Sequence, residues 1–457
     1  MRVTTTVVVA VAVAVAVGLP TALRAQVGLT IYNDGTVLVR RSVPVAVSAG
    51  LSSQRLALGA LDPASVFALD SGVVLVGSSY DESVDEQNTM RRAVGQTLKF
   101  VTGRSATPAT DTVTATVVGV NPERFRLPDG RVVFQRPGLP LYPSELVLTE
   151  PTLALAIRSA AARPALRLGY FTQGASWSAS YSVILGRGSA RVSGQAAIPS
   201  ALRVSDAEVQ LLAGSIGRAG PRPMPAMRLE EMRVAGAVAQ APAEEQQIGE
   251  AHLYSIPGRL SLEPGVTTSV ALFDPATAPW EKAFVVRGQL NYYGPLQQFG
   301  NDEGQVPVEV WYTLKRQAKT PFGELPLPAG NYRLYEADDG GRLQLIGQSQ
   351  AGHTAPGTEV RLPAGSAFDL TATRLQMSYS TRRDSTRTIA TADYRVSLKS
   401  AKDSAVTVEV LEERGGEWSV LSSSVPAEKL SSTRTRFRIR VPAKGEAVLT
   451  YRVRVVW

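Results

Sequence analysis

The chain has 457 residues, no cysteine, 44% hydrophobic residues and a formal net charge of +8. The missing cysteine excludes disulfides and thiolate metal sites and leaves no residue to carry a thioether-linked lipid anchor, so stability has to come from core burial. The excess of basic residues is concentrated between Thr381 and Trp457, where 15 Lys and Arg stand against 9 Asp and Glu. This distribution argues against a nucleic-acid-binding protein and assigns any preference for anions to the C-terminal region.

The N-terminus has the pattern of a secretory signal peptide. Arg2 precedes an apolar run over Val7–Val17, and Gly18, Pro20 and Ala25 follow. Such a run is short for a bilayer span, and the pattern predicts cleavage after Ala25. We therefore expect residues 1–25 to be a signal peptide and the mature protein to be exported to the periplasm or beyond, with about +6 net charge and no transmembrane segment.

Residues 26–148 are predicted to form one or two small β domains. Short runs rich in Val, Leu and Thr alternate with turn residues, and Asn33, Asp34 and Gly35 predict a tight hairpin. The charged segment 83–94 lacks Gly and Pro and is predicted to be a short helix. A second β unit follows from about 112 to 135, with a turn at Asp129–Gly130.

Residues 149–300 are predicted to form a middle β-sandwich. Tyr170, Trp177 and Tyr181 lie close together in the sequence, and we expect them to fill a sandwich end rather than to bind a sugar. Residues 217–250 are rich in Pro, Ala, Glu and Gln and predict a disordered insertion. Beyond it, the segments SVALF and AFVVRGQL predict two successive strands.

Residues 301–457 predict a C-terminal β-sandwich. An Asp-Asp-Gly-Gly turn at 338–341 predicts a hairpin in which Tyr332 and Leu334 share a buried face with Leu343 and Leu345. Further hairpin turns are predicted at 414–416 and 443–445. The expected fold is thus all-β, with tandem antiparallel immunoglobulin-like sandwiches, a small N-terminal β domain and a disordered insertion.

A set of segments from about 151 to 457 resembles a known family. The set comprises GASWSASYSV, AEVQLLAG, the low-complexity insertion, HLYSIPGRLSLEPG, LPLPAGNYRLYE, IGQSQAGHT, GSAFDL and the terminal VPAKGEAVLTYRVRVVW. In this order it looks like bacterial domain-of-unknown-function family 4139 (DUF4139), which includes mucoidy inhibitor A homologues. The segment AAIPSALRVSD departs from the family's usual pattern. The resemblance implies a secreted or envelope β-sandwich protein and supplies no catalytic residues.

Residues suited to catalysis or metal binding are few. His252 and His353 are the only histidines, and neither belongs to a zinc-binding motif. His353 with Asp369 and a serine is the basis of an alternative hydrolase hypothesis, although the chain lacks a GxSxG motif. The polar turns at 338–341 and 301–304 do not have the spacing of a calcium loop. We expect no catalytic residue, no metal and no cofactor.

The C-terminal strands carry a regular series of arginines. Because side chains alternate across a strand, arginines at every second position share one face. If the two strands formed a hairpin, Arg395 and Lys399 on a third strand could extend the surface they form, which suits an anionic glycan, a lipid head group or an acidic envelope protein. The alternative is a solvated face balanced by Glu409, Glu417 and other carboxylates. The six candidate anion-binding residues are Arg434, Arg436, Arg438, Arg440, Arg452 and Arg454.

The last strand also allows another hypothesis. Leu449, Tyr451, Val453, Val455 and Trp457 alternate as in the closing strand of an outer-membrane β-barrel. The short, uneven strands and the prolines favour sandwiches instead. The sequence therefore favours an exported, non-catalytic binding or structural protein of the bacterial cell envelope over a hydrolase or a barrel.

Overall fold

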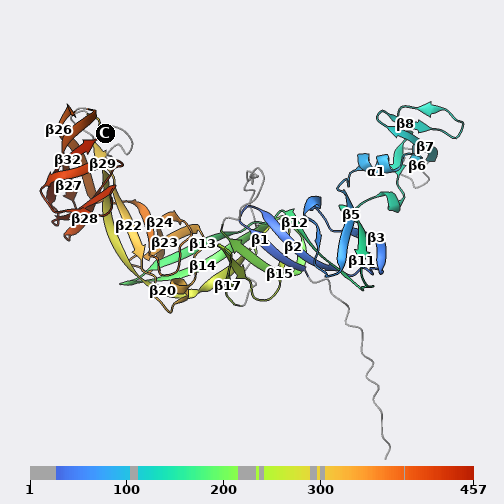
Figure 1. The fold of residues 1–457 in the computed structure, drawn as a ribbon, viewed down its shortest axis with the longest axis horizontal. Coiled ribbons are helices and arrows are strands. Elements are labelled where there is room, and N and C mark those ends of the chain that lie inside the picture. The colour runs from blue at the N-terminus through green and yellow to red at the C-terminus, as the bar shows by residue number, and fades with distance from the viewer. Residues whose placement is uncertain are drawn as a thin grey trace, which may run out of the picture. The chain divides into compact units, whose positions relative to one another are not determined.

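The computed structural model describes residues 27–102, 112–214, 233–235, 241–288, 296–298, 304–384 and 386–457. Strands account for 63% and helices for 4% of it, in several separate sheets, which confirms the predicted all-β class. The chain divides into two compact units (Figure 1). The first unit runs to Leu29 and continues over Leu38–Gln173, while the second contains Thr30–Val37 and Gly174–Trp457. The predicted signal peptide lies outside the described residues.

The first hairpin is divided between the two units. β1 (Val27–Tyr32) and β2 (Thr36–Val43) flank the predicted turn, and Gly35 adopts a φ of +89°, which glycine tolerates best. The other elements of the first unit are β3 (Gly50–Ala57), β4 (Phe67–Ala68), β5 (Val73–Asp81), α1 (Glu86–Arg92), β6 (Thr97–Val101), β7 (Thr112–Val120), β8 (Glu123–Arg126), β9 (Val132–Val133), β10 (Leu139–Leu141), β11 (Thr152–Ser159), β12 (Leu166–Gln173) and 3-10 turns at Pro63–Ser65 and Ser144–Leu146.

A small helix-containing β meander is inserted between β5 and β11, which pair with each other. Its sheet has the order β10-β6-β7-β8-β9, as the predicted meander requires. The predicted helix is α1, capped by the Asp85 carboxylate, which accepts a hydrogen bond from the Asn88 amide at 2.8 Å. Phe100 and Phe125 meet edge to face, with ring centroids 5.3 Å apart, in its core. This meander therefore has a hydrophobic core of its own.

The second unit contains the remaining strands. They are β13 (Ser178–Leu185), β14 (Ser189–Ser200), β15 (Val204–Ala213), β16 (Arg233–Ala235), β17 (Glu244–Ile248), β18 (Ala251–Ser255), β19 (Leu260–Leu262), β20 (Val266–Gly288), β21 (Gln305–Val306), β22 (Val308–Leu314), β23 (Gly330–Ala337), β24 (Leu343–Ala351), β25 (Val360–Ser366), β26 (Leu370–Asp384), β27 (Arg387–Ser400), β28 (Val406–Glu413), β29 (Glu417–Ser423), β30 (Ala427–Lys429), β31 (Arg434–Val441) and β32 (Glu446–Val456), with the helical turn α2 (Pro321–Glu324). Trp177 and Tyr181 are buried in this unit, and Tyr170 is buried in the first, as expected of packing residues.

One strand, β20, replaces the two that the sequence predicts between 266 and 288. Its first part pairs with β14, and its last part pairs with β22 and β28. The register against β14 shifts between Val192 and Gly194, so that Pro275 falls in an irregular stretch of the ladder. A proline lacks the N–H that a regular ladder needs, and a bulge removes that need. β20 therefore joins two sheets into one path, β24-β23-β13-β14-β20-β28-β31-β30.

The hairpin of β23 and β24 forms at the predicted turn, but its buried face was predicted wrongly. Tyr332 and Leu334 are buried, whereas Leu343 and Leu345 are about half exposed. The register shifts between Leu334 and Tyr335, which sets Leu345 opposite Tyr335. A shift of one residue moves a side chain to the other face of a strand, so the two leucines face away from the core.

The predicted hairpin turns at 414–416 and 443–445 were also assigned wrongly. β28 and β31 pair with each other, while β29 and β32 belong to a second sheet of order β21-β26-β27-β32-β29. The turns after β28 and after β31 therefore carry the chain from one sheet to the other. The Phe437 and Tyr451 rings, one from each sheet, lie 5.0 Å apart, so the two sheets pack face to face.

Two stretches of the predicted disordered insertion, residues 217–250, form strands, β16 and β17. β17 forms a hairpin with β18, although its sequence, EEQQI, is mostly polar. Glu245 and His252 face each other in this hairpin, with Oε1 and Nδ1 2.7 Å apart. Residues 217–232 and 236–240 of the predicted insertion lie outside the described residues.

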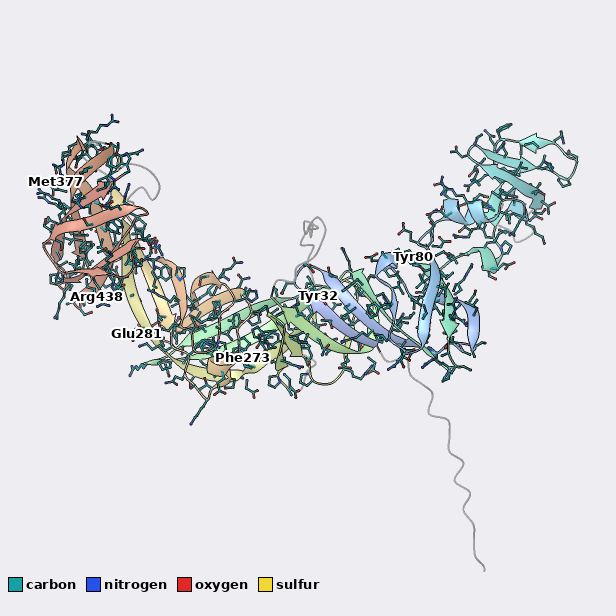
Figure 2. The ribbon with its side chains drawn as sticks, in the orientation of Figure 1. Tyr32, Tyr80, Phe273, Glu281, Met377 and Arg438 are labelled. Carbon is teal, nitrogen blue, oxygen red and sulfur yellow. The ribbon has the colours of Figure 1, made fainter. Side chains whose placement is uncertain are left out.

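A buried arginine organises the loop between β22 and β23. Arg316 is 7% exposed, and its Nε donates to the Phe322 carbonyl at 2.6 Å. Its two terminal nitrogens donate to the carbonyls of Leu325, Thr354 and Ala355. Burial of the cation lowers the pKa of the guanidinium. Figure 2 shows Phe273, which packs at a ring-centroid distance of 6.1 Å from Phe322 at this loop.

Candidate functional site

β31 places its four arginines on the outer face of its sheet. Phe437, Ile439 and Val441 alternate with them and are at most 4% exposed, because they point into the sandwich. On the neighbouring strand β28, Glu409 lies opposite Arg438. The local alternation that the sequence predicts is therefore present.

Ion pairs neutralise most of this row. Arg436 pairs with Glu409 at 3.1 Å and with Glu428 of β30 at 2.8 Å, and Arg438 pairs with the same two carboxylates at 3.4 Å each. Hydrogen bonds from Arg436 lower the pKa of Glu428, and the Glu428 carboxylate in turn raises the pKa of Arg436. The outer face of β31 is thus a balanced charge network, as the alternative reading of the sequence predicts with Glu409.

The two ends of the row differ in their partners. Arg434 pairs with Glu413. Arg440 is exposed and lies opposite Thr407, and within the described part of the chain it forms no ion pair. Glu417, the other carboxylate that the sequence suggests, pairs with Arg387 at 3.2 Å and not with the arginines of β31.

β32 carries the remaining two arginines in the facing sheet. Arg452 forms a bidentate pair with Asp393 of β27, through Nε at 2.6 Å and Nη2 at 2.9 Å. These bonds, together with one from Ser378, lower the pKa of the Asp393 carboxyl. Arg454 lies opposite Thr391, two positions along the same strand.

Arg395 on β27 adds a third guanidinium to this face. It is exposed and lies opposite Thr450, on the other side of the Asp393–Arg452 pair from Arg454. Among the described residues, neither Arg395 nor Arg454 has an ion-pair partner. Lys399, further along β27, pairs with Glu446 at 3.1 Å. Of the three guanidiniums on the outer face of β27 and β32, only that of Arg452 is paired with a carboxylate of the described residues.

The predicted surface of six arginines is not formed. It required β31 and β32 to be hydrogen-bonded neighbours, and they lie in different sheets whose inner faces meet at Phe437 and Tyr451. The two arginine rows consequently point away from each other, on opposite outer faces of the sandwich. The structure brings Arg395, Arg452 and Arg454 together and separates them from the arginines of β31, one of which, Arg438, is labelled in Figure 2.

The residues of the hydrolase hypothesis have separate partners. His353 is exposed, and its Nδ1 accepts a hydrogen bond from the Ala329 amide at 3.2 Å. Asp369 pairs with Lys402 at 3.4 Å, at the start of β26. His353 therefore holds a loop against the segment before β23, and Asp369 holds an end of the C-terminal sandwich.

The acidic turn at 338–341 uses its oxygens internally. Asp338 Oδ1 accepts hydrogen bonds from the backbone amides of Gly340, at 3.0 Å, and Arg342, at 2.9 Å. These bonds, the one from Arg342 first, lower the pKa of Asp338. Within the described residues, no group of three or more His, Asp or Glu side chains is placed to hold a metal ion. The other turn, at 301–304, lies mostly outside the described residues.

A buried polar network between the two sheets was missed by the sequence reasoning. Arg374 of β26 and Glu412 of β28 are 2% and 0% exposed in their side chains, with Nε and Oε1 3.5 Å apart. The Tyr451 hydroxyl donates to Glu412, and the Arg374 guanidinium lies 4.1 Å from the Tyr394 ring centroid. Burial and the Glu412 carboxylate raise the pKa of Tyr451. One signal was available, since Arg374 and Glu412 occupy inward positions of otherwise apolar alternating strands.

Glu412 also requires a glycine at the position opposite it on β20, which is Gly288. A Cβ placed on Gly288 would lie 2.0 Å from Glu412 Oε1 and 2.2 Å from its carboxyl carbon. No side chain fits there, so the glycine gives the carboxylate its room. The network is thus enclosed by the strands on both sides of β28 as well as by the facing sheet.

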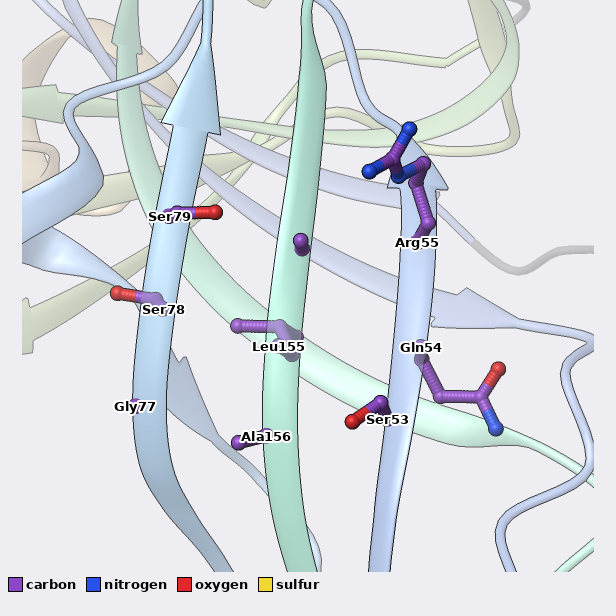
Figure 3. A pocket seen from close by; sticks show the side chains of 9 residues that line it. Ser53, Gln54, Arg55, Gly77, Ser78, Ser79, Leu155 and Ala156 are labelled. Atoms are coloured by element: carbon purple, nitrogen blue, oxygen red, sulfur yellow. The ribbon is translucent and has the colours of Figure 1, made fainter.

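The first unit has a shallow groove on the sheet formed by β3, β11 and β5. Figure 3 shows the three strands side by side, with small residues such as Ser53, Gly77 and Ala156 along them. The groove encloses about 440 Å³, and Arg55 is its charged residue. Small side chains on a flat sheet leave space without supplying directed polar groups, so the groove offers little chemistry.

Comparisons with known proteins add no relative. No protein-family model matches the chain, and no curated protein matches it. Among the residues that the structure describes, no helix has the length and apolar character needed to cross a membrane.

Proposed function

We propose that the protein is an exported, non-catalytic binding or structural component of a bacterial cell envelope. The signal-like N-terminus supports export, and the segments that look like family 4139 support an envelope role. The ion-paired row of Arg436 on β31 and the buried pair of Arg374 and Glu412 support a rigid scaffold. Separate partners for His353 and Asp369 give the hydrolase hypothesis no added support.

The binding role rests on one observation. Arg395, Arg452 and Arg454 share a face of β27 and β32 on which Asp393 is the carboxylate placed among them. Neighbouring strands lie about 4.8 Å apart, and alternate residues along a strand are spaced by about 6.7 Å. Guanidiniums at such spacing suit a ligand with repeated carboxylate, sulfate or phosphate groups. The face therefore fits an anionic glycan, an anionic lipid surface or an acidic protein of the envelope.

Matched arginine variants test this binding role. We expect the double variant Arg395→Ala/Arg454→Ala to lose about tenfold in affinity for an immobilised sulfated polysaccharide. Arg440→Ala is the control, because Arg440 is likewise exposed but lies on the other sheet. Asp393→Asn should strengthen binding several-fold, since it leaves Arg452 without its carboxylate. All binding should weaken as salt rises from about 0.05 M to 0.3 M.

These measurements test whether the outer face of β27 and β32 binds anionic ligands. Equal losses in the Arg440 and the Arg395/Arg454 variants would show a general charge effect and contradict the proposal. Parallel assays with vesicles of anionic lipid and with an acidic protein distinguish the three sources of anionic groups. An uncharged polysaccharide on the same support should retain none of the variants.

Export is tested separately by fractionation of a bacterial host. We expect a mature form, shorter by about 25 residues, in the periplasm or medium, and an unprocessed cytoplasmic form when Val7–Val17 carries two added charges. The N-terminal sequence of the recovered protein locates the cleavage site. Full-length protein confined to the cytoplasm would contradict the envelope assignment without affecting the arginine result.

A further inference from the structure

The C-terminal sandwich is open along one side. β29 is the last strand of the five-stranded sheet, and β30 is the last strand of the larger sheet. A slot of about 220 Å³ lies between them. The residues that line it include Trp418, Val420, Ala427, Lys429, Ser432 and Thr435.

The walls of the slot belong to the inner faces of the two sheets. Trp418 and Val420 lie opposite Val455 and Val453, which are at most 1% exposed. On the other sheet, Ala427 lies opposite Phe437, which is fully buried. Residues directly opposite each other in an antiparallel pair share a face. The slot is therefore a stretch of sandwich core that no further strand of the described residues covers.

Two of the polar groups that line the slot, the indole of Trp418 and the ammonium of Lys429, are hydrogen-bond donors only. The Trp418 indole nitrogen is buried, and among the described residues it has no hydrogen-bond partner. Lys429 is exposed and, in the same part of the chain, forms no ion pair. The residues that line the slot include no Asp or Glu. A buried donor without a partner is costly, so an acceptor that enters the slot gains a hydrogen bond at little desolvation cost.

We propose that this slot receives an extended strand from a partner protein, with alternating apolar side chains directed between the sheets and an acidic side chain directed to Lys429. Edge strands present unpaired backbone groups that pair with an added strand, and pockets between sheets select its side chains. The register of β29 against β32 shifts between Val420 and Ser422, which restricts regular pairing to the segment before it, Glu417–Val420. This site goes beyond the proposed anion-binding face, because its apolar walls lie on the inner faces of the two sheets, whereas Arg395 and Arg454 lie on an outer face.

A peptide titration on the full chain tests the slot. The probe is an acetylated and amidated eight-residue peptide of alternating valine and threonine in which the valine nearest the C-terminus is replaced by aspartate, so that the aspartate shares the inward side with the other valines, as Lys429 does. Two control peptides carry lysine at the aspartate position or proline at the two central valines. The readout is the indole N–H resonance of Trp418 in ¹⁵N-labelled protein, assigned with Trp418→Phe.

The expected result is a shift of the Trp418 resonance with the aspartate peptide and affinity about tenfold above that of the lysine peptide. The proline peptide should not bind, because it cannot pair with an edge strand. Ala427→Phe, which fills the slot, should abolish the shift, and exposed Lys429→Glu should reverse the preference between the charged peptides. Lys429→Glu keeps the test valid if Ala427→Phe fails to fold.

Several outcomes would overturn the inference. They are no shift with the aspartate peptide up to about millimolar concentration, equal binding of the three peptides, and a shift caused by an oligosaccharide of uronic acids in place of the peptide. The variant Arg395→Ala/Arg454→Ala should leave peptide binding unchanged. Loss of peptide binding in that variant would place the peptide on the arginine face and also contradict the slot.

Discussion

At the scale of single residues, an arginine of the C-terminal sandwich is ion-paired only where the neighbouring strand places a carboxylate beside it. Arg436 and Arg438 share Glu409 and Glu428, whereas Arg454 and Arg395 lie opposite threonines. The alternation that places all of them on outer faces is local and was predicted from the sequence. Their partners come from β27, β28 and β30, so the difference between a neutralised and an available arginine could not be predicted locally.

The Asp393–Arg452 pair predicts a pH-dependent contribution to stability. The pKa of Asp393 in the folded protein lies below the ordinary value of 3.8, because Arg452 donates to the carboxylate. A lowered folded-state pKa contributes stability that is present above the unfolded-state value and is lost as pH falls through the folded-state value. We expect Asp393→Asn to lower the free energy of unfolding by about 0.5–1 kcal/mol at pH 7, a figure limited by solvent screening, and to have a smaller effect near pH 2.

Urea unfolding of the wild type and the variant at the two pH values measures this difference. Lys399→Ala is the control, since it removes another, more exposed ion pair between β27 and β32. A stability difference for Asp393→Asn that is as large at pH 2 as at pH 7 would show that the carboxylate charge is not its cause.

At the scale of elements, the two facing sheets are joined by the network around Arg374 and Glu412. Both side chains are almost fully buried. The Tyr451 hydroxyl donates a hydrogen bond to Glu412, and the Arg374 guanidinium lies over the Tyr394 ring. The inward positions of these residues can be read from the strand alternation. The contact between Arg374 and Glu412 could not be predicted in this way, because β26 and β28 belong to different sheets.

This network predicts strong coupling between its two charged residues. Glu412→Leu or Arg374→Met alone should lower the free energy of unfolding by about 3–5 kcal/mol, because each leaves a buried charge without its partner. Arg374→Met/Glu412→Leu should cost much less than the sum of the two single changes. Chemical denaturation of the four proteins measures the coupling, and simple additivity of the two losses would contradict a direct interaction between the two charges.

At the scale of the whole molecule, the second unit is discontinuous in the sequence. Thr30–Val37 belongs with Gly174–Trp457, and the Asn33 side chain donates to the Trp177 carbonyl at 2.9 Å. Tyr32, labelled in Figure 2, packs against the cluster of Leu212, Ala251 and Leu253. The predicted boundary near 149 followed the composition of the chain, which does not reveal that an early hairpin contributes to a later unit.

A truncation tests this division. A fragment of residues 174–457 should be more sensitive to protease than the same region in the whole chain and about 1–3 kcal/mol less stable, because it lacks the strand that covers Leu212 and Leu253. A synthetic peptide of residues 26–43 should restore part of the loss. A fragment as resistant as the whole chain, with no response to the peptide, would show that Thr30–Val37 contributes little to the unit.

The sequence by itself determined the all-β class, the absence of disulfides, the helix at α1, and the alternation of arginine and apolar residues on β31 and β32. These features depend on composition, capping and a two-residue period, which are local properties of a chain. Only the tertiary structure decided that the turns after β28 and β31 pass between sheets, that Leu343 and Leu345 face outward, and that three arginines remain together on one face. Gly416 adopts a left-handed φ of +81° in a crossover between sheets, just as a hairpin glycine would. Because local turn chemistry is the same in both cases, the choice between them depends on which apolar faces bury each other.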